Sequence, residues 1–293
     1  MTIREFMMQF EACCPLSWSE SWDASGLQMG QAEEDLQCLL LALDFDRATL
    51  EQAQACHANL VFTHHPPFFH PLSRLRAEDP EEGLLWQAAR SGLAIYAAHT
   101  NWDAAPGGVS DQLMQTLGLS SQGTLWPLPN AIEQQQVFWQ SLPECVVNRA
   151  QALQKAWLSQ QVLPGYGRYT DELQDAKLVH FLKRINQHLQ GLGLWLNTDE
   201  HETEVGRLAC IGGAYDASWL SDILRLKIKT LVVGEIKHHQ MQQLAAHQVQ
   251  AVMVGHDVSE RVVLHPWASE IRRWYPNLQV EVWTGLNYNH WLS

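Results

Sequence analysis

Histidines and carboxylates that follow short apolar runs are the residues of this sequence that could do chemistry. Thr63-His64-His65-Pro66-Pro67 directly follows the apolar run NLVF. Two adjacent imidazoles cannot share one rotamer direction, so His64 and His65 could serve two neighbouring metal ions, with the prolines stiffening the loop that aims them. A pair of surface histidines is the alternative, and the motif alone leaves both interpretations open.

A second motif, AHTNWD at 98–103, also follows an apolar run, and Pro106-Gly107-Gly108 comes after it. Asp103 could supply a hard oxygen ligand. His99 could be a further ligand, a hydrogen-bond donor behind the ligands, or a general base. The alternative is that Asp103 caps a helix that begins near Gly108.

The third motif is GHDVSE at 255–260, after the apolar run AVMV. If a helix starts near Val258, His256 lies at its mouth and Glu260 in its first turn. Residues four apart on a helix can converge on one cation, and a carboxylate can bridge two. The alternative is that Ser259 and Glu260 only serve the helix N-terminus.

Strand-like and helix-like segments alternate around these motifs. Apolar runs at 38–44, 59–63 and 93–98 alternate with helical patterns at 47–57 and 81–91, and the alternation resumes after residue 205. Continuous apolar strands between helices are typical of mostly parallel sheets that are covered on both faces. The sequence therefore predicts an α/β protein of two similar interlinked lobes, each a mostly parallel sheet flanked by helices.

The two predicted lobes share a pattern. Residues 42–65 and 211–235 both show a strand, an acidic turn, a helix and a second apolar strand. We predict an N-terminal lobe over 1–125 that carries HHPP and HTNWD, and a C-terminal lobe over 126–293 that carries GEIKHH and GHDVSE. The boundary is poorly defined over 126–204, because the alternation is weaker there.

The three motifs together predict one kind of site. Open α/β sheets bind ligands at the carboxyl ends of their strands, which is where each motif lies. The six cysteines contain no CxxC pair. A mixed set of imidazoles and carboxylates suits two divalent ions of the zinc, iron, manganese or nickel class, and no other cofactor is indicated.

Composition excludes several classes of protein. Of 293 residues 46% are hydrophobic and 17% charged, so the chain can bury a large core. The formal net charge of −13 opposes general nucleic-acid binding. Charged residues interrupt the N-terminal apolar stretch, and no apolar run reaches the roughly 20 residues of a membrane span. With unpaired cysteines, these features predict a cytoplasmic protein without a membrane partner.

The motifs resemble those of the GTP cyclohydrolase 1 type 2 family, also called the Nif-three-like family. The matching strings occur in the family's order over about 1–120 and 205–265. They are WDASGLQ (22–28) with Gly30, FTHHPPFF (62–69), AHTNWDAAPGG (98–108), GEIKHH (234–239) and GHDVSE (255–260). At 293 residues the chain is similar to the short form, without the long inserted domain.

The resemblance implies a two-metal site on His64, His65, Asp103, His256 and Glu260, with Glu260 bridging. It also implies a homo-oligomer, a toroidal hexamer of two-lobed subunits. Glu235 ends the run TLVVG and belongs to the family's GE pattern, so it is expected near the ligands or the substrate. His238 and His239 are expected to be solvated.

Hydrolysis is the reaction that two metal ions support best, because they lower the pKa of a bridging water and polarise the bond that it attacks. The family name implies opening of the guanine imidazole ring of GTP with loss of formate, with His99 or Glu235 moving protons. No GxxxxGK[ST] phosphate-binding motif is present. The alternatives are a metal-dependent phosphoesterase or damaged-nucleotide hydrolase, and a non-enzymatic hexameric scaffold or regulator.

Overall fold

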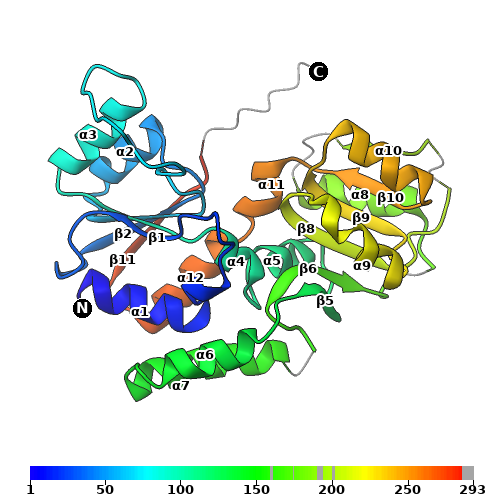
Figure 1. Cartoon of the computed structure of the whole chain (residues 1–293), viewed down its shortest axis with the longest axis horizontal. Helices are drawn as coiled ribbons and strands as arrows, with labels where there is room; N and C mark the ends of the chain where they lie inside the picture. Colours follow the sequence, from blue (N-terminus) through cyan, green and yellow to red (C-terminus); the bar gives the residue numbers. More distant parts are fainter. Residues whose placement is uncertain (159–160, 174, 190–193, 200–201, 286–293) are drawn as a thin grey trace. The chain divides into compact units, whose positions relative to one another are not determined.

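The computed structural model of the chain describes residues 1–158, 161–173, 175–189, 194–199 and 202–285, and its elements are labelled in Figure 1. The chain forms two compact units. Unit 1 contains Met1–Trp102, Ile132–Gln151 and the chain from Leu264 to the end of the last strand. Unit 2 contains Asp103–Ala131 and Ala152–Val263.

Unit 1 is built on a five-stranded sheet in the order β1-β4-β3-β2-β11. Its strands are β1 (Gly26–Met29), β2 (Cys38–Ala42), β3 (Leu60–Thr63), β4 (Ala94–Ala97) and β11 (Gln279–Trp283). Strand β1 is antiparallel to β4, and the other neighbours run parallel. Strands β2, β3 and β4 are buried along their whole length. This burial accounts for their continuous apolar runs, because a central parallel strand is covered on both faces.

Helices α2 (Arg47–Ala55) and α3 (Glu82–Arg90) cover one face of this sheet (Figure 1). Leu50 of α2 and Ala88 of α3 pack with Leu40 and Val61 of the sheet. Helix α2 starts at a carboxylate cap, because the side chain of Asp46 accepts a hydrogen bond from the backbone of a residue in the first turn.

Helices α1 (Ile3–Cys13) and α12 (Leu264–Trp274) cover the opposite face (Figure 1). The ring of Phe10 on α1 lies 4.8 Å from that of Phe62 on β3 and 5.3 Å from that of Trp267 on α12, centroid to centroid. These edge-on contacts form the aromatic core of unit 1.

Two helices from the middle of the chain also contribute to unit 1. They are α6 (Ala131–Trp139) and α7 (Glu144–Leu158). The side chains of Gln135 and Trp139 donate hydrogen bonds to the backbone oxygen of Ala12, at 2.8 and 2.9 Å. Ala12 lies in the last turn of α1, where a carbonyl has no partner within its own helix. Helix α6 is therefore attached to the end of α1 by these two hydrogen bonds.

Unit 2 is built on a six-stranded sheet in the order β5-β6-β8-β9-β10-β7. The strands are β5 (Gly123–Pro127), β6 (Gly165–Thr170), β7 (Trp195–Leu196), β8 (Leu208–Ala214), β9 (Thr230–Glu235) and β10 (Gln250–Met253). The central strands β8, β9 and β10 run parallel. Strands β6 and β7 are antiparallel to their neighbours in this centre, and β5 is antiparallel to β6.

The helices of unit 2 pack around its three parallel strands. They are α5 (Val109–Thr116), α8 (Leu178–His188), α9 (Leu220–Arg225), α10 (His238–Ala246) and α11 (His256–Arg261). Leu113 of α5, Phe181 of α8 and Val258 of α11 share one core cluster with Val232 of β9. The crossover helices α9 and α10 bury Ile223 and Leu244 completely.

The predicted α/β fold class is confirmed, with two helix-flanked sheets. The segments 42–65 and 211–235 both contain a strand, a helix and a parallel neighbouring strand. The sheets differ from the expected pattern at their margins, because β1, β5, β6 and β7 pair antiparallel.

The two units do not follow a single division of the chain near residue 125. Unit 2 already begins at Asp103, and unit 1 takes back Ile132–Gln151 and the chain after Leu264. The physical reason is strand pairing: β11 lies parallel to β2, with Val280 opposite Leu39, so the C-terminal strand completes the first sheet.

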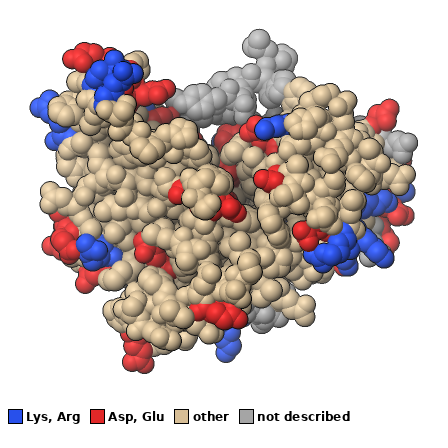
Figure 2. All heavy atoms as spheres, in the orientation of Figure 1, with Lys and Arg blue, Asp and Glu red and all other residues tan. Residues whose placement is uncertain are grey.

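Two surface properties complete the description. No helix in the described ranges is both long and apolar enough to span a bilayer. Figure 2 shows acidic side chains in many places on the displayed face and basic side chains in a few groups, as expected for a formal net charge of −13.

Candidate metal centre

Three histidines gather at one edge of the sheet of unit 1. In the strand register Ala42, Thr63 and Ala97 lie side by side, so β2, β3 and β4 end together. His64 and His65 follow β3, and His99 comes two residues after β4. Ring nitrogens of the three imidazoles lie within 4.8 Å of one another, close enough to hold a metal ion.

Each imidazole in this cluster has its Nδ1 atom bound to an oxygen. His64 Nδ1 lies 2.8 Å from the backbone oxygen of Ala98, His65 Nδ1 lies 2.7 Å from Asp44 Oδ1, and His99 Nδ1 lies 2.9 Å from Asp23 Oδ1. Carbonyl and carboxylate oxygens only accept, so Nδ1 carries a proton in each ring and Nε2 is the nitrogen that could bind a metal ion. Metal-binding histidines are oriented in this way by their surroundings.

Asp23 holds His99 through a fully buried carboxylate. It also accepts hydrogen bonds from the backbone N–H and the hydroxyl of Thr100, at 3.0 and 2.6 Å, and from Ser25 at 2.8 Å. Burial by itself would raise the pKa of Asp23, but the hydrogen bonds from His99 and Thr100 hold that pKa well below its usual range. The carboxylate is therefore ionised and accepts the Nδ1 proton of His99.

The alternative of two surface histidines does not describe this edge. His64 is completely buried, and the side chain of His65 is 27% exposed. The ring of His64 lies 5.9 Å from that of Trp102, which is itself buried against Phe10. Trp102 therefore forms part of the core beneath the histidines.

A second cluster lies at the corresponding edge of the sheet in unit 2. Ile211, Val233 and Met253 are side by side in the register of β8, β9 and β10. Just beyond them, His256 Nδ1 lies 3.0 Å from Glu235 Oε2, and His256 Nε2 lies 3.1 Å from Glu260 Oε1.

His256 and Glu260 are close enough that one cation could bind to both. Nδ1–H of His256 donates to Glu235, so Nε2 is the ring nitrogen that lies 3.1 Å from Glu260 Oε1. Glu260 is almost fully buried, whereas Glu235 is exposed. Glu235 thus orients His256, as the carboxylates of unit 1 orient their histidines.

Gly213 leaves room for the carboxylate of Glu260, and Ser259 holds the helix that carries it. Gly213 has a φ of +67°, and a Cβ built on it would lie 2.4 Å from Glu260 Oε1 and 3.6 Å from His256 Nε2. The hydroxyl of Ser259 accepts from the backbone N–H of Gly213 at 2.9 Å and donates to the backbone oxygen of His256 at 2.7 Å. Ser259 therefore ties α11 to β8 and is not a cap, since no side chain caps this helix.

Asp103 lies in the short helix α4 (Thr100–Ala104). Asp103 does not cap the next helix. The N-cap residue of α5 is Gly108, and no side chain makes a capping hydrogen bond to the start of α5. Carboxylate oxygens of Asp103 and Glu260 lie within 4.8 Å of each other, which brings two hard oxygen donors together in unit 2.

The donor set fits transition-metal ions. It consists of imidazole nitrogens and carboxylate oxygens with oriented rings, and it contains no cysteine. His238 and His239, which the sequence places outside the site, are exposed on α10. The residues that could hold a metal ion are therefore His64, His65 and His99 in unit 1, and Asp103, His256 and Glu260 in unit 2.

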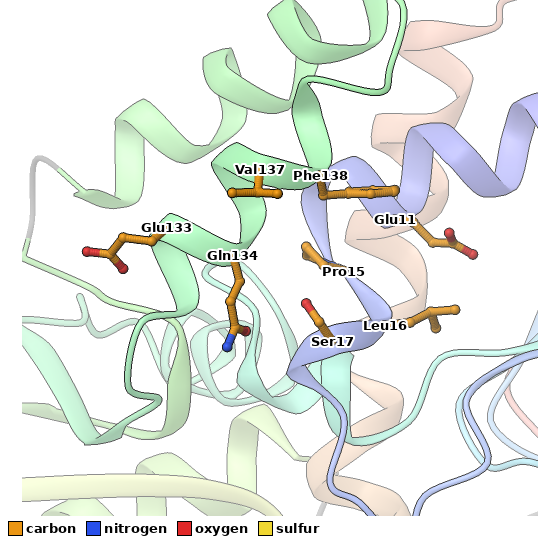
Figure 3. A pocket seen from close by; sticks show the side chains of 8 residues that line it. All are labelled: Glu11, Pro15, Leu16, Ser17, Glu133, Gln134, Val137 and Phe138. Atoms are coloured by element: carbon orange, nitrogen blue, oxygen red, sulfur yellow. The ribbon is translucent and has the colours of Figure 1, made fainter.

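A separate hollow of about 570 Å³ lies in unit 1 between α6 and the chain after α1 (Figure 3). Gln134 and Val137 on α6 face Pro15 and Ser17. The lining contains two carboxylates but neither histidine nor cysteine. Its donors do not resemble a transition-metal site.

The comparison with known families rests on the whole chain. The sequence model of the Duf34/NIF3 family (NGG1p interacting factor 3) matches residues 1–287. The chain belongs to this family. Membership in the Duf34/NIF3 family confirms the resemblance that the five motifs carry.

Relatives within the Duf34/NIF3 family match over most of their length. A GTP cyclohydrolase 1 type 2 homolog from Lactococcus lactis is 25% identical over 263 residues, which cover 90% of this chain and 89% of that protein. NIF3-like protein 1 of Drosophila melanogaster is 26% identical over 259 residues, which cover 88% of this chain and 77% of that protein.

Solved structures share the fold. A Bacillus cereus protein related to NIF3 has a TM-score of 0.80 at 19% identity, over 100% of this chain and 99% of that chain. Staphylococcus aureus protein SA1388 has a TM-score of 0.81 at 22% identity, also over 100% of this chain and 99% of that chain. These similarities support the two-sheet architecture of Duf34/NIF3 proteins.

Sequence reasoning missed the residues that orient the ligands. Asp23, Asp44 and Gly213 carry no metal-ligand spacing, and each acts through a contact between distant segments. Asp44 does close the apolar run CLLLALD, and Asp23 lies in the string WDASGLQ. A carboxylate at the end of a predicted parallel strand is the signal that could have found Asp44.

Proposed function

We propose that this chain is a hydrolase that holds two divalent metal ions and acts on a nucleotide. The observation that carries the proposal is the common orientation of the imidazoles. His64, His65, His99 and His256 all have Nδ1 hydrogen-bonded to an oxygen, so Nε2 is the nitrogen that could bind a metal ion in each ring.

In this proposal His64, His65, Asp103, His256 and Glu260 would hold the metal ions, and Glu260 would be the ligand that the resemblance implies is shared. The mixed nitrogen and oxygen set suits zinc, iron, manganese or nickel. When bound, two such ions lower the pKa of a bridging water toward neutrality and polarise the bond that it attacks.

His99 is the group that we assign to proton transfer. Its Nδ1 proton is donated to the ionised carboxylate of Asp23, so Nε2 is the basic atom of the ring. The same carboxylate stabilises the imidazolium once Nε2 has taken a proton. Glu235 acts on His256, by accepting its Nδ1 proton and fixing its ring.

The metal proposal is tested by elemental analysis of the full chain. We expect about two equivalents of a transition metal in the native protein. His64→Ala and Glu260→Ala should lose metal, while His238→Ala, which removes an exposed histidine on α10, should keep it. Equal metal contents in all three variants would contradict the ligand assignment.

The reaction is tested on GTP, the substrate named for relatives such as the Lactococcus lactis homolog. We expect formate release by the metal-loaded protein and none by Glu260→Ala. Release of phosphate without formate would favour a phosphoesterase or a damaged-nucleotide hydrolase on the same residues. No turnover over a nucleotide panel, with metal bound, would favour the scaffold or regulator.

A further inference from the structure

Two exposed aromatic side chains stand beside His99 in unit 1. Trp22 is 57% exposed and Phe69 is 46% exposed. The ring of His99 lies 5.9 Å from that of Trp22 and 6.2 Å from that of Phe69, centroid to centroid. Large aromatic rings at the surface lose the benefit of burial unless something covers them.

Both rings are attached to parts of the chain that the site holds in place. Trp22 directly precedes Asp23, whose buried carboxylate accepts hydrogen bonds from His99, Thr100 and Ser25. Phe69 follows His65 by four residues, after two prolines that restrict the backbone. The rings are therefore positioned by the same segments that position the histidines.

The geometry of the pair differs from that of the core aromatics. Phe62 and Tyr96 are buried and stack at 5.2 Å with an interplanar angle of 23°. Trp22 and Phe69 lie 5.8 Å apart at 47°, so neither ring covers the face of the other. The ring of His99 meets them at 73° and 71°. Phe69 also lies 5.2 Å from His70, at 81°. Since both rings are about half exposed, part of each remains accessible to a third planar group.

We propose that Trp22 and Phe69 bind the planar heteroaromatic ring of the substrate and hold it next to His99. The proposal rests on the nucleotide hydrolase proposed above and names the residues that recognise the base. Stacking on an aromatic side chain tolerates any base, because every base has a π face. The pair therefore provides affinity for the ring, and discrimination among bases falls to other groups.

The experiment measures binding and does not depend on turnover. Equilibrium dialysis of the Zn²⁺-loaded full chain gives dissociation constants for guanosine and for ribose 5-phosphate, which lacks the ring. The variants are Trp22→Leu, which keeps an apolar side chain, Trp22→Phe, which keeps an aromatic face, and Phe69→Leu. Trp86→Leu on α3 removes another exposed tryptophan of unit 1 as a matched control.

We expect Trp22→Leu and Phe69→Leu to weaken guanosine binding by about 5- to 150-fold, the range for loss of one stacking partner. Trp22→Phe should recover most of the affinity, and Trp86→Leu should match the native protein. Metal content and the affinity for ribose 5-phosphate should stay unchanged in every variant.

Three results would overturn the proposal. Guanosine that binds the native chain no better than ribose 5-phosphate would show that no ring site exists. Unchanged guanosine affinity in Trp22→Leu and Phe69→Leu would place the ring elsewhere. A fall in the assembly mass of these variants would show that the pair is a contact between subunits. Ring binding that is lost as expected, without formate release from GTP, would contradict only the proposed hydrolase.

Discussion

The orientation of each histidine depends on a residue that contacts its ring and that, in the proposal, does not itself bind a metal ion. Asp44 illustrates this most simply, because its carboxylate is half exposed and accepts the Nδ1 proton of His65 at 2.7 Å. His99 has a corresponding partner in Asp23, and His256 in Glu235. Such carboxylates fix the tautomer and raise the basicity of the ring.

For Asp44→Ala we expect a metal affinity about 10- to 100-fold weaker than native, because the His65 ring loses its orienting acceptor. Titration of the metal-free protein with Zn²⁺ measures this effect. Glu51→Ala, which removes an exposed carboxylate on α2, serves as the control. Equal affinities of the two variants would show that Asp44 does not position a ligand.

Gly213 limits the space around Glu260. In Gly213→Ala the new methyl group would meet Glu260 Oε1 at 2.4 Å, and the backbone would keep a φ of +67° that L-residues rarely adopt. We expect lower metal content together with lower stability, measured by elemental analysis and urea unfolding.

Gly92→Ala separates the two causes in that prediction. Gly92 also has a positive φ, +74°, but a Cβ there meets no atom within 4 Å. The Gly92→Ala variant should lose about 1 kcal/mol of unfolding free energy through backbone strain, and its metal content should stay unchanged. Loss of metal in both variants to the same degree would mean that displacement of Glu260 is not the cause.

At the level of elements, a buried ion pair joins α5 to β6. Arg168 and Asp111 are fully buried, with Nε and Oδ2 2.8 Å apart. Arg168 also donates to backbone oxygens of Gly165, Gly167 and Ala105, and Asp111 accepts from the backbone N–H of Gly107. This network holds the chain between α4, which carries Asp103, and α5.

Asp111→Ala should lower the free energy of unfolding by about 3–5 kcal/mol, because it leaves the guanidinium of Arg168 buried without its carboxylate. The contrasting variant is Asp171→Ala, which breaks the part-exposed pair with Arg207 in the same unit. That change should cost about 0–1 kcal/mol. Urea unfolding of both variants measures these free energies. Similar decreases in the two variants would show that burial of the Arg168–Asp111 pair does not determine its contribution to stability.

At the scale of the whole molecule, the net negative charge and its distribution over the surface affect how subunits associate. The chain has a net charge of −13, and acidic side chains are spread over the face in Figure 2. Like charges on subunits repel, and salt screens that repulsion. Subunit association of this chain should therefore strengthen as the ionic strength rises toward physiological values.

We propose a homohexamer, as the resemblance implies, and expect light scattering to report six times the 33.3 kDa of one chain. The measurement should be made in low and in physiological salt, where the hexamer fraction should increase. A mass of one chain at both salt concentrations would contradict the assembly.

Several parts of the fold follow from local pattern. The run CLLLA forms β2, LVFT forms β3, and the helical pattern between them forms α2 from Arg47 to Ala55. Apolar continuity, strand length and a carboxylate cap are properties of a few neighbouring residues, so sequence alone carries them. The positions of His64, His65 and His99 after strands follow in the same way.

The partners of these histidines depend on strand order. Asp23 and His99 are 76 residues apart, and they meet because β1 pairs with β4. No periodicity within either segment specifies that pairing, because many strand orders satisfy the same apolar pattern.

By itself, the sequence determined which residue types could bind a metal, the strands and helices that precede them, and the family, since each rests on residues close together along the chain. Only the tertiary structure decided that β11 completes the first sheet, that Asp23 accepts a hydrogen bond from His99, and that Gly213 leaves space for Glu260. These are contacts between segments far apart in sequence, and they form only when specific strands lie side by side and their side chains share the same space.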